Sequence, residues 1–348
     1  MTESELLLFG SRRTPTPRVL PRLVTAGQFF ALATGERFTA IECSDFNLYG
    51  RYLKGENVEP VLEQRADCGF NMRRVWSRYS GNEKFEREIG RLLPSEHPEL
   101  YDRIPEFSAL CASYGAYIEW TAYTGGYRED HWERLGDALE GVPNVLVELI
   151  NENDAYPHNI RVQEFQPLPG IICSHGSNGS QSWPVRPWWD YETYHTNDSG
   201  NEEQRKIGHN AMEFSDGTPD EMKNGVRVKG IPASRVPTLT NETSRYPDVG
   251  MWRGQLDDRQ QQLAFDSAAG AALLCAGSCF HSQRGKDSTL WDADSLAVAK
   301  AWTAGARSVD LACQAGPYTH PASQEGPTDL RVYERPVAGH QCVVTIRK

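Results

Sequence analysis

The chain has 348 residues, of which 39% are hydrophobic and 24% are charged, as in ordinary globular proteins. Its formal net charge of -11 argues against a nucleic-acid partner. No apolar run approaches the length of a transmembrane helix. The N-terminal apolar run, residues 6–9, is too short and too close to acidic residues for a signal peptide. We therefore expect neither a nucleic-acid nor a membrane partner.

Eight cysteines occur, and no two of them form a C-x-x-C pair. Several, such as Cys173 and Cys275, lie within apolar patterns, which predicts reduced and buried thiols. This cysteine usage and the missing signal peptide predict cytoplasmic synthesis. Incorporation into a virion and release by a non-classical route both stay open.

Residues 1–22 are rich in Arg, Thr and Pro, and predict an N-terminal arm that could contact a protein partner or stay poorly ordered. Residues 28–32 and 37–41 flank an Ala-Thr-Gly-Glu turn, which predicts a hairpin running into a first barrel strand. Helical and β-prone segments then alternate. The further strands are expected at 70–76, 116–121, 145–150, 171–175, 190–195, 238–240 and 277–281, and helices at 58–68, 107–114, 132–139, 263–274 and 295–308.

This alternation is typical of parallel βα units. Eight strands in about 270 residues match the size of a (β/α)8 barrel. We therefore predict an α/β fold: a TIM barrel over residues 23–312 with an N-terminal hairpin. Residues 313–348 predict a short C-terminal β-hairpin packed on the barrel, because so few residues cannot bury a core of their own.

Two β-prone segments end in an Asn-Glu pair. Residues 145–150 form a strongly apolar strand that ends at Asn151 and Glu152, and residues 236–240 lead into Asn241 and Glu242. The carboxyl ends of parallel strands are where α/β folds place their chemistry. Two carboxylates there suit glycoside hydrolysis, since one donates a proton while the other attacks the sugar carbon or activates water.

The order of these residues resembles the clan of retaining (β/α)8 glycosidases that contains the cellulase and β-mannanase families, and is similar to glycoside hydrolase family 5. The resemblance covers roughly residues 28–310. It rests on five elements in the expected order: the candidate N-terminal hairpin, Gly69-Phe70-Asn71-Met72-Arg73-Arg74 at strand two, Asn151-Glu152 at strand four, Tyr194-His195 at strand six and Glu242 at strand seven.

The resemblance implies that Glu152 is the acid/base and Glu242 the nucleophile. It further implies that Arg74 and Asn151 bind at the site, with Asn151 on the sugar 2-hydroxyl, and that Tyr194 or His195 orients the nucleophile. Arg74 could instead be a structural ion-pair residue.

The sequence departs from that clan in two places. His281 ends strand eight where many members carry a Trp, and Asn-Glu-Asn replaces Asn-Glu-Pro. Both departures bear on the substrate more than on the reaction.

Other candidates for substrate contact are Asp45 at the end of strand one, His281 at the end of strand eight and three tryptophans. These are Trp76, Trp120 and Trp183, which could stack on a sugar or pack in the core. Histidines 175, 195, 209 and 281 could form a metal site. However, no H-x-H pair marks strand one, so we predict no metal. No nucleotide- or cofactor-binding motif occurs, and we predict no cofactor.

These observations predict a retaining O-glycoside hydrolase that acts on a β-linked oligo- or polysaccharide by double displacement. Two alternatives remain open. One is a non-catalytic carbohydrate-binding or structural barrel in a larger assembly, such as a phage particle. The other is a metal-dependent barrel hydrolase.

Overall fold

The structure is a computed structural model of the whole chain. It describes residues 17–27, 29–79, 90–124, 130–151, 162–176, 189–195, 221–223, 226–228, 237–245, 276–281, 287–309, 324–325, 330–337 and 340–347, and seven positions between 261 and 272.

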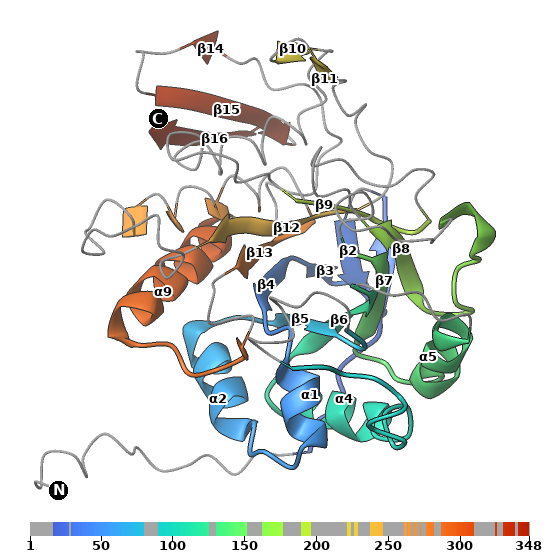
Figure 1. Cartoon of the computed structure of the whole chain (residues 1–348). Coiled ribbons are helices and arrows are strands. Elements are labelled where there is room, and N and C mark those ends of the chain that lie inside the picture. The colour runs from blue at the N-terminus through green and yellow to red at the C-terminus, as the bar shows by residue number, and fades with distance from the viewer. Residues whose placement is uncertain are drawn as a thin grey trace, which may run out of the picture.

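Eight parallel strands form the central sheet (Figure 1). Their hydrogen-bonded order is β8-β7-β6-β5-β4-β13-β12-β9. The two outermost strands also meet, because Asp190 N donates to Cys173 O and Cys173 N donates to Asp190 Oδ2, both at 2.9 Å. The sheet therefore closes into the predicted (β/α)8 barrel. The strands are β4 (Ala40–Ser44), β5 (Met72–Trp76), β6 (Tyr117–Tyr123), β7 (Val145–Ile150), β8 (Ile172–Gly176), β9 (Glu192–His195), β12 (Thr238–Arg245) and β13 (Gly277–His281).

The described helices lie around the outside of these strands (Figure 1). Local sequence explains where one of them ends and where another begins. Gly69 adopts φ 99° after the last residue of α2, a left-handed conformation that glycine accepts at little cost. Asp292 caps α9 by accepting a hydrogen bond from Ser295 N at 2.9 Å. The helices are α1 (Leu48–Leu53), α2 (Glu59–Cys68), α4 (Ile104–Ser113), α5 (His131–Leu139), the 3-10 helix η2 (Val162–Glu164) and α9 (Ala293–Ser308).

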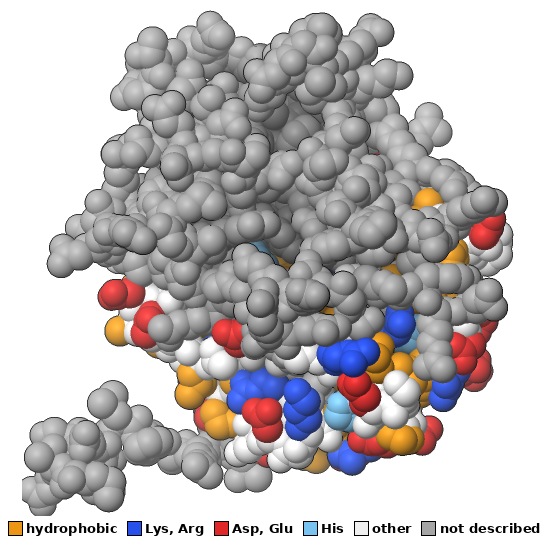
Figure 2. Space-filling model, in the orientation of Figure 1, with side chains coloured by type: hydrophobic (Ala, Val, Ile, Leu, Met, Phe, Trp, Pro, Cys, Tyr) orange, Lys and Arg blue, Asp and Glu red, His pale blue; other side chains and the backbone are white. Residues whose placement is uncertain are grey.

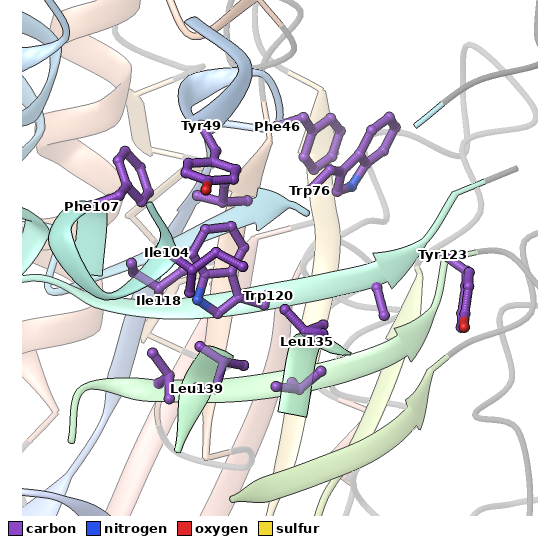
Figure 3. Close-up of a cluster of buried hydrophobic side chains, with 14 of the residues drawn as sticks. Phe46, Tyr49, Trp76, Ile104, Phe107, Ile118, Trp120, Tyr123, Leu135 and Leu139 are labelled. Carbon is purple, nitrogen blue, oxygen red and sulfur yellow. The ribbon is translucent and has the colours of Figure 1, made fainter. Parts of the chain in front are cut away.

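Large apolar side chains fill the space between the helices and the sheet. Trp120 of β6 lies among Tyr49, Ile104 and Phe107, and all four are fully buried (Figure 3). A second cluster joins α2 and α9 to β13, with Trp302 packed on Phe280. Helix packing thus occupies the outer face of the sheet and leaves the inner face to the barrel interior.

The amino end of the barrel is covered by a small antiparallel sheet. The predicted hairpin is present as β2 (Phe29–Leu32) and β3 (Arg37–Phe38), and β1 (Leu23–Ala26) adds a strand that the sequence did not indicate. Leu23 and Phe30 pack against Met72 and Leu146 at the starts of barrel strands. This floor seals one end, so the opposite, carboxyl end remains for a site.

Two further antiparallel units lie outside the barrel strands. The predicted C-terminal hairpin is confirmed as β15 (Leu330–Val337) and β16 (His340–Arg347), joined by β14 (Gln324–Glu325). A hairpin of β10 (Glu221–Lys223) and β11 (Val226–Val228) lies between the strands expected at 190–195 and 238–240, where we predicted no strand. The domain boundaries at residues 22 and 312, and the packing of the C-terminal hairpin on the barrel, stay predictions.

The surface and the cysteines agree with an ordinary globular protein. Acidic and basic side chains are interspersed over the described part of the face in Figure 2. Cys43, Cys68, Cys111, Cys173 and Cys279 are buried free thiols. Among the residues that the structure describes, none of the helices combines the length and hydropathy of a transmembrane span.

Candidate active site

The site is built at the carboxyl end of β7. Asn151 directly follows this strand and is almost fully buried. Its backbone N–H donates to Tyr123 O at 2.9 Å, and its side-chain Oδ1 accepts a hydrogen bond from Arg74 Nη2 at 2.8 Å. Both contacts fix the residue that immediately precedes Glu152.

Arg74 comes from β5 and points into the barrel interior. Its Nη2 donates to Glu148 Oε2 at 2.6 Å and its Nε lies 3.2 Å from the same oxygen. The Nε also lies 3.5 Å from Glu119 Oε2. The predicted site residue is thus an ion-pair residue as well, and the same guanidinium holds Asn151.

Arg73, its neighbour in sequence, points to the opposite face of the sheet, because successive side chains of a strand alternate between the two faces. Its Nε lies 3.7 Å from Asp45 Oδ2, and Arg65 Nη2 lies 3.2 Å from Asp45 Oδ1. All three side chains are completely buried. Because two arginines from β5 and α2 already hold the Asp45 carboxylate, this placement favours a structural role for Asp45 over the predicted hydroxyl contact.

The barrel interior holds three carboxyl groups that our sequence reasoning missed: Glu42 on β4, Glu119 on β6 and Glu148 on β7, each 0% exposed. Glu148 also accepts hydrogen bonds from Thr121 Oγ1 and Thr193 Oγ1, both at 2.9 Å. The signal was present in the sequence. Each of these residues interrupts an otherwise apolar buried strand, where an acidic side chain is rare.

These carboxyl groups differ in their electrostatics. Burial raises the pKa of Glu42 to about 8, against an opposing effect of Arg74. Burial also raises the pKa of Glu119 well above its usual range, and the neighbouring Glu42 and Glu148 push it in the same direction. The interior therefore favours a neutral form for part of its acidic groups at neutral pH.

An aromatic group lies over the ends of β4, β5 and β13. Trp76 stacks on Phe46 with ring centroids 4.2 Å apart and an interplanar angle of 12°. His281 lies 5.3 Å from the Phe46 ring, and its Nδ1 is 2.8 Å from Ser44 Oγ. Two predicted substrate contacts, Trp76 and His281, are therefore brought together, and both are nearly buried.

Trp120 does not belong to this group. Its ring packs on Tyr49 at 5.1 Å and on Phe107 at 5.7 Å, in the layer between helices and sheet (Figure 3). It is 0% exposed. This placement favours the core-packing alternative over sugar stacking.

Glu152 and Trp183 lie outside the described residues, and so do the side chains of Glu242, Tyr194 and His195. The backbone still locates Glu242 within β12, whereas we expected the strand to end before it. The pairing of β12 with β13 shifts register between Thr240 and Ser244, around Glu242. Such irregularities bend a strand and re-aim its side chains, and they are common next to active sites.

The described residues contain no group of three or more His, Cys, Asp or Glu side chains arranged to hold a metal ion. His281 is engaged with Ser44, and His175 packs on Trp189 with ring centroids 3.9 Å apart. His209 lies outside the described residues.

Sequence comparisons find no counterpart for this chain: no family model matches it, and no curated protein does. Solved structures do match. A glycoside hydrolase family 5 mannosidase from Rhizomucor miehei has a TM-score of 0.53 at 12% identity, over 84% of this chain and 98% of that chain.

Two GH5_18 structures match equally well. The one from Bifidobacterium longum subsp. infantis has a TM-score of 0.51 at 11% identity, over 78% of this chain and 79% of that chain. The one from Streptomyces cattleya, in complex with GlcNAc, has a TM-score of 0.51 at 10% identity, over 82% and 83%. The chain therefore has the barrel fold seen in glycoside hydrolase family 5 structures.

Proposed function

We propose that the protein is a retaining O-glycoside hydrolase that cleaves a β-linked oligo- or polysaccharide, with Glu152 as acid/base and Glu242 as nucleophile. The observation that carries this proposal is the bond between Arg74 and Asn151. It fixes the residue before Glu152 at the carboxyl end of a barrel whose fold is shared with family 5 structures. Fold alone does not determine function, so the site residues carry the argument.

The proposed reaction has two steps. The Glu242 carboxylate attacks the anomeric carbon while Glu152 protonates the leaving oxygen, which gives a covalent glycosyl-enzyme. Water, deprotonated by Glu152, then releases the sugar with retained configuration. Asn151 would hydrogen-bond the 2-hydroxyl, a contact that strengthens in the transition state.

The role of Arg74 follows from its partners. Its charge is largely neutralised by Glu148, only 2.6 Å away. A guanidinium whose charge is already paired lowers the pKa of a further carboxylate only weakly. We therefore assign Arg74 the role of positioning Asn151 rather than that of a free cation beside Glu242.

Aromatic side chains beside the site support a sugar substrate. Phe46 and Trp76 stack on each other with His281 beside them, all three nearly buried, and aromatic faces of this kind are what sugar rings pack against. Trp183, Tyr194 and His195 remain predicted contacts. No cofactor or metal is needed for this chemistry.

The decisive experiment is intact-mass spectrometry after incubation with 2-deoxy-2-fluoro glycosides that carry activated leaving groups. A retaining enzyme accumulates one covalently bound sugar, and peptide mapping should find it on Glu242. An adduct on another carboxylate would reject Glu242 as nucleophile. Absence of an adduct and of hydrolysis, together with binding on a glycan array, would favour the carbohydrate-binding alternative.

Two variants test the separate roles. Glu242→Gln should abolish turnover and labelling. Glu152→Ala should impair poor leaving groups most, and azide should restore activity on activated glycosides. Glu133→Gln, on the exposed face of α5, is the matched control and should behave as wild type. Full loss of activity on chelation, reversed by metal, would instead support the metal-dependent alternative.

A further inference from the structure

The interior of the barrel beneath Asn151 carries more negative than positive charge. Glu42, Glu119 and Glu148 project from β4, β6 and β7, and Arg74 of β5 is the guanidinium that acts on all three. All four residues are 0% exposed. Ionised carboxylates without a counter-charge are strongly disfavoured in such surroundings. The excess negative charge must therefore be neutralised, and a bound proton can do this.

The hydrogen bonds identify which carboxyl groups bear the charge. Glu148 accepts hydrogen bonds from the side chains of Arg74, Thr121 and Thr193, an arrangement that stabilises a carboxylate. Glu119 Oε1 accepts from the Tyr191 hydroxyl at 2.8 Å, while its Oε2 lies 3.5 Å from Arg74 Nε.

Glu42 is different from both. Neither of its oxygens accepts a hydrogen bond of ordinary geometry from the described residues, and the same holds for Glu119 Oε2. The neighbours that act on its charge are Arg74 and Glu148, the Cys279 thiol from β13, and the Glu119 carboxyl. A protonated carboxyl group is itself a donor, so one proton shared between Glu42 and Glu119 would supply the hydrogen bond that these oxygens lack.

We propose that Glu42 and Glu119 share one proton in a hydrogen bond between their carboxyl groups, and that this pair acts as a positioning element for Arg74. Glu119 on one side and Glu148 on the other then hold the guanidinium so that Nη2 reaches Asn151. If Glu42 ionised, a third negative charge would compete for Arg74 and weaken its hold on Asn151. The raised pKa of Glu42, about 8 because of burial, agrees with a neutral group at neutral pH.

The first test uses the pH dependence of the free energy of unfolding to count the protons bound by the folded chain, and it needs no substrate. Glu42 binds a proton in the folded chain up to pH of about 8, and in the unfolded chain only below its ordinary value near 4.3. The folded state therefore holds the extra proton between these values, and stability falls as pH rises through this window. One proton corresponds to a tenfold rise in the unfolding constant per pH unit.

The comparison is between wild type, Glu42→Gln and the exposed control Glu140→Gln, each unfolded in urea at several pH values between 5 and 8. The amide of Glu42→Gln imitates the neutral acid and does not titrate. For each pH unit, the unfolding constant of this variant should therefore increase by a factor up to ten times smaller than in wild type. Glu140→Gln should follow wild type. Parallel profiles for Glu42→Gln and wild type would overturn the proposal.

If Glu42→Gln fails to fold, a second variant and a spectroscopic measurement on wild type still test the proposal. Glu119→Gln removes the other member of the pair and should also flatten the profile. Infrared spectra of wild type at pH 7 should contain a protonated-carboxyl C=O band that shifts in D2O and disappears as pH rises past 8. Absence of such a titrating band would overturn the proposal without any variant.

The positioning role rests on the proposed function and has its own readout. As pH rises from 7 to 9, kcat/KM of wild type should fall further than that of Glu42→Gln, because only wild type gains the third charge. Equal falls would reject positioning. Inactivity of every variant, wild type included, would reject the proposed function and leave the stability result unaffected.

Discussion

At the scale of single residues, the site depends on how one guanidinium is shared. Arg74 binds Glu148 at 2.6 Å and Asn151 at 2.8 Å, both without access to solvent. A buried ion pair is only weak support for stability compared with apolar packing, but breaking it leaves an uncompensated charge. Replacement of Glu148 should therefore reduce the free energy of unfolding more than replacement of its hydrogen-bond donors.

We predict that Glu148→Gln lowers the free energy of unfolding by about 3 kcal/mol, the usual cost of breaking a buried pair. The amide keeps the volume but cannot neutralise Arg74. Thr121→Val removes one of the hydrogen bonds to Glu148 and keeps the shape, so it should cost about 1 kcal/mol. Urea unfolding measures both. Similar losses would mean that the charge of Glu148 contributes little.

Sequence reasoning located the candidate residues better than their partners. It identified Arg74 and Asn151, and the structure joins them directly. It did not foresee that the interior carboxyl groups gather around Arg74. A Glu within an apolar strand was a visible signal, but it does not say what lies opposite on the other strands. For Asp45 and Trp120 the deciding contacts, Arg65 and Phe107, lie on separate elements.

At the scale of elements, the Gly69-Phe70-Asn71 segment positions β5 and with it Arg74. Gly69 ends α2 with φ 99°. Asn71 Oδ1 accepts from Ile41 N at 2.8 Å and Asn71 Nδ2 donates to Thr39 O at 2.9 Å, which ties the start of β5 to the start of β4. Part of the motif behind the family resemblance is thus structural, and its conformational demands can be tested by themselves.

We predict that Gly69→Ala destabilises the protein by about 1–2 kcal/mol, because an L-residue resists the left-handed conformation. A Cβ there would also lie 3.1 Å from the Arg307 guanidinium, which donates to Gly69 O. Gly141→Ala is the control, with φ 75° and open space around the added atom. Thermal or urea unfolding should show the larger loss for Gly69→Ala. A smaller loss than for Gly141→Ala would show that Arg307 yields freely.

Element order was readable from the sequence because helical and β-prone segments alternate. Element ends were less so. β12 was expected to end before Asn241 but continues to Arg245, and the register shift with β13 that accompanies this extension is set by the neighbouring strand. The short helix α1 was also missed, since its six residues show too little periodicity.

At the scale of the whole molecule, the barrel is completed between β8 and β9. Every other neighbouring pair of strands is held by a parallel ladder. Here the described contacts are those of Asp190, whose N–H and carboxylate both bond to the backbone of Cys173. Asp190 thus supplies one backbone and one side-chain hydrogen bond at this seam, and Thr193 of β9 also bonds to Glu148 of β7, the strand beyond β8.

The seam can be tested without altering the site. Asp190→Ala removes the acceptor for Cys173 N–H and leaves a buried donor unsatisfied, which should cost about 1–3 kcal/mol. Asp190→Asn loses the same charge but keeps an oxygen acceptor, so its loss should be smaller. Native-state hydrogen exchange then asks whether the damage is local: the Cys173 amide should exchange faster in Asp190→Ala than in Asp190→Asn. If both variants exchange at the wild-type rate, closure of the barrel does not depend on this side chain, and the hydrogen bond from Asp190 N to Cys173 O is sufficient.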